Sequence, residues 1–144
     1  MNSSSTIMLV DDSPDDVALT LRAFKKNNIT NKVVVAADGE EALRYLLPDD
    51  DSSNPVPDLV LLDINLPKVN GLEVLRRLRQ DDRTRYLPVV VLTTSNEERD
   101  IVETYDLGAN SFVRKPVVFG DFLEAVRVLG MYWLLVNQPA KGTG

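Results

Sequence analysis

Four short runs that suit strands, three of them entirely apolar, are each followed by a side chain that can take part in chemistry. Each run suits a strand of a parallel sheet, and the carboxyl ends of such strands meet at one edge. Because an unpaired buried carboxylate costs several kcal/mol, acids in such places need a physical reason. The residues are Asp11 and Asp12 after IMLV, Asp63 after LVLL, Thr93 after VVVL, and Lys115 after SFVR.

These groups suit phosphoryl transfer. Three neighbouring acids repel one another, and a divalent cation together with the charge of Lys115 relieves that repulsion. The same charges neutralise a phosphoryl group in transit, while a carboxylate can act as its nucleophile. Asp63 is the best candidate nucleophile because it ends the most apolar run, and Asp11 and Asp12 are better placed as metal ligands. The Thr93 hydroxyl can then hydrogen-bond the new phosphoryl oxygen.

Each of these residues also has a simpler interpretation. The sequence Asp12-Ser13-Pro14 is a common helix start, Asp63 can cap a turn, and a Lys-Pro pair usually forms a turn. The consistent order of suitable groups after four strands is what favours a shared site.

Composition narrows the chemistry further. The 144-residue chain has no cysteine and no histidine, and its formal net charge is −6. Disulfides, phosphohistidine and the usual zinc sites are therefore excluded, and the expected metal is a hard cation, Mg²⁺ first and Mn²⁺ as a possibility. We expect no nucleic-acid partner, since phosphate binding needs clustered Lys and Arg. With no signal peptide and no run of about 20 apolar residues, we expect a cytoplasmic protein without a membrane partner.

Apolar strands alternate with amphipathic helices along the chain. Ser13 and Asp16 have the spacing of a capping box before one helix, and Ser95 and Glu98 before another, which should end near Gly108. The last helix is expected over Phe119–Val136, and the polar stretch Pro48–Pro57 should be a loop. The predicted strands are Ile7–Val10, Lys32–Ala36, Asp58–Asp63, Leu87–Thr93 and Ser111–Arg114.

Strands that are apolar throughout, each followed by a helix, predict a parallel sheet covered on both faces, a doubly wound α/β sandwich. We expect one domain over residues 7–137, with a disordered N-terminus (1–6) and a flexible tail (138–144).

The motifs together resemble the receiver domain of two-component response regulators, over roughly Ile7 to Val136. The resemblance implies a flavodoxin-like (βα)5 fold with strand order 2-1-3-4-5. It is carried by the acidic pair Asp11-Asp12, LLDINLP around Asp63, Asn70-Gly71, VVVL before Thr93, Gly108-Ala109, and VRKP at Val113–Pro116.

By this resemblance Asp63 accepts a phosphoryl group from a histidine kinase. The resemblance implies Mg²⁺ held by Asp12, Asp63 and the backbone carbonyl of Asn65, with Asp11 assisting through water. Lys115 would contact the phosphoryl group, and the Lys115–Pro116 bond is commonly cis in the family.

Other positions acquire roles in the same way. Thr93 and Phe112 occupy the switch positions of the family, where Phe112 replaces the frequent Tyr and lacks its hydroxyl. Asn65 and Ser95 lie where the family tunes hydrolysis of the phosphoryl group.

The sequence is also similar to the small regulators that partner bacterial phytochromes. The supporting segments are DINLPKVNG at Asp63–Gly71, LTTSNEE at Leu92–Glu98, and a final helix running into Tyr132-Trp133-Leu134. A phytochrome is therefore the expected kinase, and the downstream partner is unknown.

Only NQPAKGTG follows Val136, so the expected output is a changed surface on the fourth helix, fifth strand and fifth helix. Phe122, Val126, Leu129 and Trp133 form one apolar stripe, which we expect to face the core. Apolar residues continue on the other sides of the same helix, which predicts a homodimer; the alternative is that they fold back onto their own domain. The proposed dimer residues are Tyr132, Trp133, Leu134 and Val136.

Three other functions remain as alternatives. A phosphatase of the haloacid dehalogenase kind needs an acid two residues after the nucleophile, where this chain has Asn65. A flavodoxin-like nucleotide binder needs a Gly- or Ser/Thr-rich loop after the first strand, where Asp11-Asp12 would repel phosphate. A pseudo-receiver that is never phosphorylated would not need the complete set of acids.

Overall fold

The computed structural model describes residues 5–49, 54–109 and 111–135. Strands and helices alternate along the chain, and a short 3₁₀ helix, η2, follows the last α-helix. The elements are β1 (Thr6–Val10), α1 (Pro14–Lys26), β2 (Lys32–Ala36), α2 (Gly39–Leu46), β3 (Leu59–Asp63), α3 (Gly71–Gln80), β4 (Val89–Thr93), α4 (Asn96–Thr104), β5 (Ser111–Arg114), α5 (Phe119–Val128) and η2 (Tyr132–Leu134).

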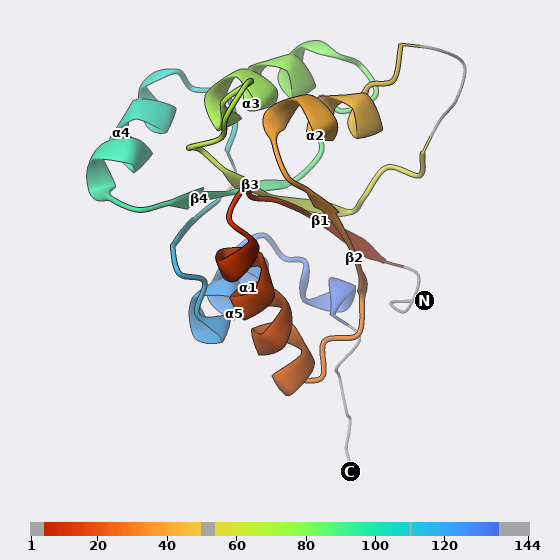
Figure 1. Ribbon diagram of the computed structural model, residues 1–144, viewed down its shortest axis with the longest axis vertical. Helices are drawn as coiled ribbons and strands as arrows, with labels where there is room; N and C mark the ends of the chain where they lie inside the picture. The colour runs from red at the N-terminus through yellow and green to blue at the C-terminus, as the bar shows by residue number, and fades with distance from the viewer. Residues whose placement is uncertain (1–4, 50–53, 110, 136–144) are drawn as a thin grey trace.

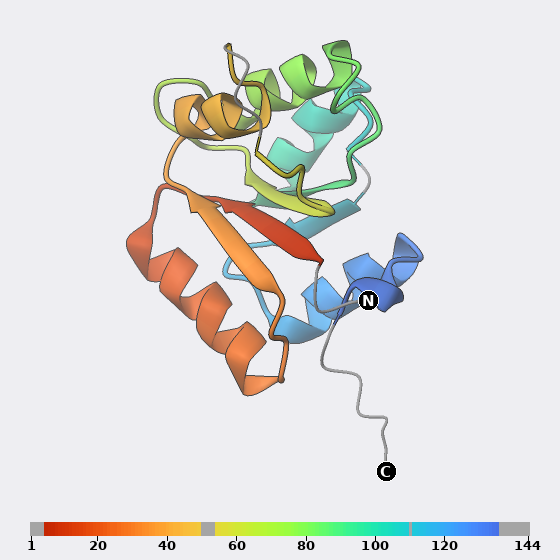
Figure 2. The same ribbon diagram turned by 90° about the vertical axis from the view of Figure 1, so that its right-hand side faces the viewer.

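All five strands pair in parallel, in the order β2-β1-β3-β4-β5. Helices α2, α3 and α4 cover one face of the sheet, and α1 and α5 cover the other (Figures 1 and 2). The predicted flavodoxin-like, doubly wound (βα)5 sandwich is therefore confirmed. The order of the chain reverses at β1 and β3, which places the carboxyl ends of these two neighbouring strands at the switch point where such folds bind ligands.

The apolar strands explain the layers. Every residue of β3 and β4 is buried, because side chains that alternate between the two faces meet helices on both. Met8, Val60 and Val91 pack under α2, α3 and α4, whereas Ile7, Leu61 and Leu92 pack against α1 and α5. Asp63 thus ends a strand that is fixed from both sides.

The last helix differs from its prediction. Helix α5 ends at Val128 instead of Val136 because Gly130 adopts a left-handed φ of 70°. The Gly130 N–H donates to Arg127 O and the Met131 N–H to Val126 O, which together make a Schellman motif. The chain then turns back onto its own domain.

This turn corrects the expected use of the terminal apolar residues. Met131, Leu134 and Leu135 are buried against α5 and the sheet, so the alternative of folding back is correct for them and Leu134 offers no surface to a second chain. Trp133, placed in the core-facing stripe by the sequence, is instead 52% exposed.

Other boundaries move by a few residues. Strand β1 begins at Thr6, so the predicted N-terminal disorder does not reach that residue, and α4 ends at Thr104, before the expected Gly108. The predicted loop Pro48–Pro57 contains residues 50–53, and these, the first four residues, Val136 and the predicted tail 138–144 lie outside the described residues. In the described part of the chain, no helix has the length and apolar character needed to cross a membrane.

Candidate functional site

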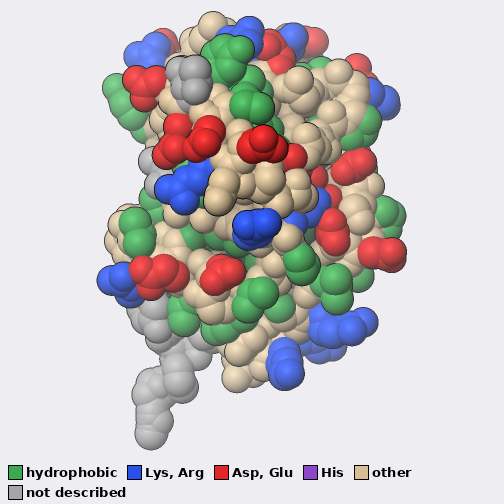
Figure 3. Space-filling view, turned by 90° about the vertical axis from the view of Figure 1, so that its left-hand side faces the viewer, with side chains coloured by type: hydrophobic (Ala, Val, Ile, Leu, Met, Phe, Trp, Pro, Cys, Tyr) green, Lys and Arg blue, Asp and Glu red, His purple; other side chains and the backbone are tan. Residues whose placement is uncertain are grey.

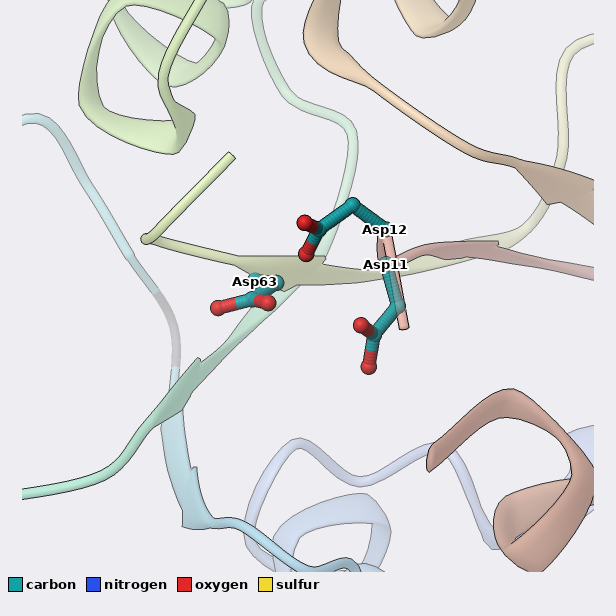
Figure 4. A group of neighbouring side chains, drawn as sticks. All are labelled: Asp11, Asp12 and Asp63. Atoms are coloured by element: carbon teal, nitrogen blue, oxygen red, sulfur yellow. The ribbon is translucent and has the colours of Figure 1, made fainter. Parts of the chain in front are cut away.

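The carboxyl edge of the sheet brings together the strand-end side chains that the sequence pattern predicts to share a site. Asp11 and Asp12 follow β1, Asp63 ends β3, Thr93 ends β4, and Lys115 follows β5. Asp11, Asp12 and Asp63 each offer a carboxylate oxygen, and these oxygens lie within 4.8 Å of one another. Figure 4 shows the three carboxylates gathered beyond the ends of β1 and β3. The predicted convergence of the three acids is therefore what the fold produces.

Lys115 is the positive centre of this group. Its Nζ lies 2.9 Å from Asp63 Oδ2 and 3.1 Å from Asp11 Oδ2, and its side chain is only 9% exposed. The backbone fixes its origin, because the Lys115 N–H donates to Thr93 O at 2.8 Å and thereby continues the pairing of β5 with β4. The following Lys115–Pro116 bond is cis, as expected.

Burial and ion pairing shift the pKa values of Asp63 and Lys115 in opposite directions. Burial raises the pKa of Asp63 above its ordinary value, and the hydrogen bonds from Lys115 and from the Asn65 N–H offset only part of that rise. For Lys115, burial alone would lower the pKa, but the hydrogen bonds to Asp63 and Asp16 raise it above its ordinary value. Lys115 is therefore a permanent cation, and the charged form of Asp63 is held at a cost.

The acids fit a hard divalent cation. Asp11 and Asp63 are each 2% exposed and Asp12 is exposed, so of the three acids only Asp12 opens the group to solvent. Lys115 supplies one positive charge against the three acids, which leaves an excess of negative charge that a divalent cation can balance. Carboxylate and carbonyl oxygens are the ligands that Mg²⁺ and Mn²⁺ prefer.

Of the two expected switch residues, Thr93 ends β4 and Phe112 lies in the neighbouring strand β5. Thr93 is 4% exposed, and Phe112, half-buried in β5, lines the same surface hollow of about 270 Å³. The guanidinium of Arg99 in α4 lies over the Phe112 ring, 4.9 Å from its centroid, which is a cation–π contact. The contact partner of Phe112, Arg99, is a residue that sequence reasoning did not select.

The two expected tuning residues, Asn65 and Ser95, both contact Glu98, and Asn65 also contacts Asp63. The Asn65 N–H donates to Asp63 Oδ1 at 3.0 Å, and the Asn65 amide nitrogen donates to Glu98 Oε2. Ser95 is the N-cap of α4, and its hydroxyl accepts from the Glu98 N–H.

Sequence reasoning missed Asp16 and Glu98 as site residues because it assigned both to capping boxes. Half of each box is present, since Ser13 accepts from the Asp16 N–H and Ser95 from the Glu98 N–H. The second hydrogen bond of each predicted box, from the N-cap N–H back to the acid, is replaced by other contacts. The Glu98 carboxylate accepts from the Thr94 N–H and hydroxyl. The Ser13 N–H donates to Asp11 Oδ1, and the Asp16 carboxylate pairs with Lys115 at 3.0 Å. The available signal was an acid in the first turn of a helix that starts directly beside the strand-end acids.

Figure 3 shows the molecule from the side where β4 ends and α4 begins. Acidic and basic side chains are interspersed on this face, and no broad basic surface is visible there. The face therefore has mixed charge around a locally acidic site.

Comparisons with known proteins agree with the geometry. The sequence profile described as the response regulator receiver domain matches residues 7–127. The chain is 36% identical over 141 residues to response regulator Rcp1 of Synechocystis sp., covering 96% of each protein. It is similar to the solved bacteriophytochrome response regulator AtBRR, with 48% identity, a TM-score of 0.84, and coverage of 94% of this chain and 99% of that one. The Mn²⁺-bound structure of Rcp1 matches with 36% identity and a TM-score of 0.71, over 90% of this chain and 94% of that one. The chain belongs to the response regulator receiver domain family.

Proposed function

We propose that this protein is a response regulator whose Asp63 carboxylate accepts a phosphoryl group from a histidine kinase. The observation that carries the proposal is the position of Asp63 Oδ2, which is buried at a strand end and 2.9 Å from a lysine ammonium. The same carboxylate has Asp11 and Asp12 as neighbours within reach of a shared cation. The sheet edge therefore holds, at one point, a nucleophile, a positively charged lysine and a set of possible metal ligands.

The residues divide the work as follows. An Asp63 oxygen forms the new bond to phosphorus while the bond from phosphorus to the imidazole nitrogen of the donor breaks. The ammonium of Lys115 donates to the transferred group and holds its charge. Asp12, Asp63 and the Asn65 carbonyl would hold Mg²⁺ or Mn²⁺, with Asp11 assisting through water. When bound, such a cation neutralises phosphoryl oxygens.

The output would be a change of surface. The phosphoryl group carries nearly two negative charges, about one more than the Asp63 carboxylate that it replaces, and the Thr93 hydroxyl can move toward it. Phe112 would then enter the space that Thr93 leaves and give up its contact with Arg99. The faces of α4, β5 and α5 would rearrange for a downstream partner.

A bacterial phytochrome is the proposed kinase, because AtBRR is named as a bacteriophytochrome response regulator. Mg²⁺ is the proposed cation, and the Mn²⁺-bound Rcp1 structure supports the class of divalent ion. A cytoplasmic location is part of the same proposal. The predicted homodimer also stays a proposal. It now centres on Trp133, since Leu134 is buried and the Val136 and Tyr132 side chains lie outside the described residues.

The alternatives gain less support. The position two residues after Asp63 holds Asn65, whose amide donates to Glu98, so no general acid of the phosphatase kind stands there. Acids, in place of a phosphate-binding loop, follow β1, which disfavours a nucleotide binder. Phosphorylation itself distinguishes a receiver from a pseudo-receiver.

The test is phosphorylation by a small donor. The protein is incubated with acetyl phosphate and Mg²⁺, and intact mass spectrometry is expected to find one added phosphoryl group. Asp63→Asn should abolish the addition, whereas Asp82→Asn, which changes an exposed acid on the α3–β4 connection, should leave it unchanged. A wild-type protein that never gains the mass would refute the proposal. Phosphotransfer from a panel of purified kinases that includes phytochromes then tests the donor.

A further inference from the structure

The ammonium of Lys115 is shared by three carboxylates. Its Nζ lies 2.9 Å from Asp63 Oδ2, 3.0 Å from Asp16 Oδ2 and 3.1 Å from Asp11 Oδ2. The ammonium donates hydrogen bonds to Asp63 Oδ2 at 2.9 Å and to Asp11 Oδ1 at 3.2 Å, and it forms an ion pair with Asp16. A lysine ammonium has three N–H donors, so the third can serve Asp16. The three acids come from different elements or loops and surround the ammonium.

Two of these acids belong to the group that could hold a cation, and the third does not. Asp11 and Asp63 have oxygens within 4.8 Å of each other and of Asp12, whereas Asp16 is outside this group. When a cation is bound, Asp11 and Asp63 divide their negative charge between the cation and Lys115. Asp16 pairs with Lys115 and is not a member of the group that could hold the cation.

Local structure explains why Asp16 is available. It lies in the first turn of α1, where an acid usually bonds back to the N-cap residue. The N-cap here is Ser13, whose N–H already donates to Asp11 Oδ1 at 3.0 Å. The Asp16 carboxylate is thereby left to reach Lys115, and its side chain is 32% exposed, so it pairs at the rim of the site.

We propose that Asp16 is a positioning residue that fixes the ammonium of Lys115 for phosphoryl transfer to Asp63. The inference rests on the function proposed above. As Asp63 Oδ2 bonds to phosphorus, the N–H that it accepted passes to a phosphoryl oxygen. The hydrogen bond to Asp11 and the ion pair with Asp16 persist, so the ammonium keeps its place while one donor changes partner.

The test compares Asp16→Asn with Asp15→Asn. Asp15 is its exposed neighbour in the same helical turn, so both variants lose one negative charge beside the site and at the start of α1. The rate of phosphorylation by acetyl phosphate is measured in saturating Mg²⁺. A displaced catalytic partner costs a large factor in rate, and we expect Asp16→Asn to be about ten-fold slower than Asp15→Asn. Asp16→Glu, which keeps the carboxylate, should recover part of the loss.

Two further measurements separate positioning from other roles. Heteronuclear NMR of the lysine NH₃⁺ groups follows Lys115 directly without phosphorylation, and its signal should broaden or disappear in Asp16→Asn and persist in Asp15→Asn. The affinity for Mg²⁺, measured by calorimetry, should be equal in the two variants, because neither residue is a proposed ligand.

The outcomes are distinct. Equal phosphorylation rates and equal Lys115 signals in the two Asn variants would overturn the inference, even if Asp63 is phosphorylated normally. A loss of Mg²⁺ affinity confined to Asp16→Asn would also overturn it, since Asp16 would then act on the metal. If the wild-type protein is not phosphorylated at all, the proposed function fails, and the NMR comparison still decides whether Asp16 holds Lys115.

Discussion

The Asn65 side chain, in the loop after β3, donates a hydrogen bond to Glu98 in the first turn of α4. Glu98 also accepts from the Thr94 N–H at 2.7 Å and from the Thr94 hydroxyl at 2.9 Å. Burial would raise the pKa of Glu98, but the hydrogen bonds from Thr94 and Asn65 hold it below its ordinary value. One ionised carboxylate therefore ties the loop after β3 to the loop after β4, next to the proposed switch residue Thr93.

Removing this carboxylate should loosen the β4–α4 loop. In Glu98→Ala the Thr94 N–H loses its acceptor, so its hydrogen exchange with solvent should accelerate. The free energy of unfolding should fall by about 1 kcal/mol, the usual net value of such hydrogen bonds. Glu97→Ala, which shortens the exposed neighbouring acid, is the control and should leave Thr94 exchange unchanged. Unchanged exchange in Glu98→Ala would show that the hydrogen bonds to Glu98 do not hold the β4–α4 loop in place.

A divalent cation should stabilise the folded protein. Asp11, Asp12 and Asp63 are brought together only by folding, so a cation that binds them favours the native state. At a concentration of about one hundred times its Kd, Mg²⁺ should raise the free energy of unfolding by about 2.7 kcal/mol. Urea unfolding with and without Mg²⁺ measures the difference. Asp12→Asn should lose most of it and Asp82→Asn none; a wild-type protein that is indifferent to both Mg²⁺ and Mn²⁺ would contradict the assignment.

Gly71 allows the loop after β3 to close against the strand that carries Asp63. A Cβ at this position would lie 2.3 Å from Asp63 O and 2.6 Å from Ile64 Cα, both backbone atoms that cannot move aside easily. Gly71→Ala should therefore lower the free energy of unfolding by about 3 kcal/mol or more and slow phosphorylation of Asp63. Gly120→Ala is the matched control, since a Cβ there has nothing within 4 Å and should stabilise helix α5 by about 0.5 kcal/mol. Equal stabilities of the two variants would refute the steric argument.

The sequence could predict the strand-end groups because of one physical constraint. Strands that are apolar throughout, each followed by a helix, favour a parallel sheet covered on both faces. The carboxyl ends of its strands share an edge, which brings Asp11, Asp63 and Lys115 together. No side-chain geometry was needed for that step. The partners of Asp16 and Glu98 could not be predicted, because a capping box and an ion pair at the site use the same residue at the same position of a helix.

The C-terminal end of α5 could not be predicted from the sequence for a different reason. The apolar pattern continues beyond Gly130, and it fits a longer helix as well as a turn that folds back. The left-handed φ of Gly130 and the burial of Leu134 decide between these two structures, and both depend on space available beside the sheet. Periodicity alone therefore placed Trp133 in the core, where the structure has Leu134 and Leu135.

The adjacent residues Trp133 and Leu134 of η2 should respond differently to substitution. Leu134 is fully buried, so Leu134→Ala should lower the free energy of unfolding by about 2–5 kcal/mol through the lost burial and the cavity it leaves. Trp133 is 52% exposed, so Trp133→Glu should leave unfolding nearly unchanged and instead break the proposed homodimer. Sedimentation of the wild type and both variants, before and after phosphorylation, measures the mass. A wild-type protein that is monomeric in both states, or a Trp133→Glu variant that stays dimeric, would rule out a dimer formed through this residue, because an exposed indole replaced by a carboxylate cannot remain in a dry interface without a large cost.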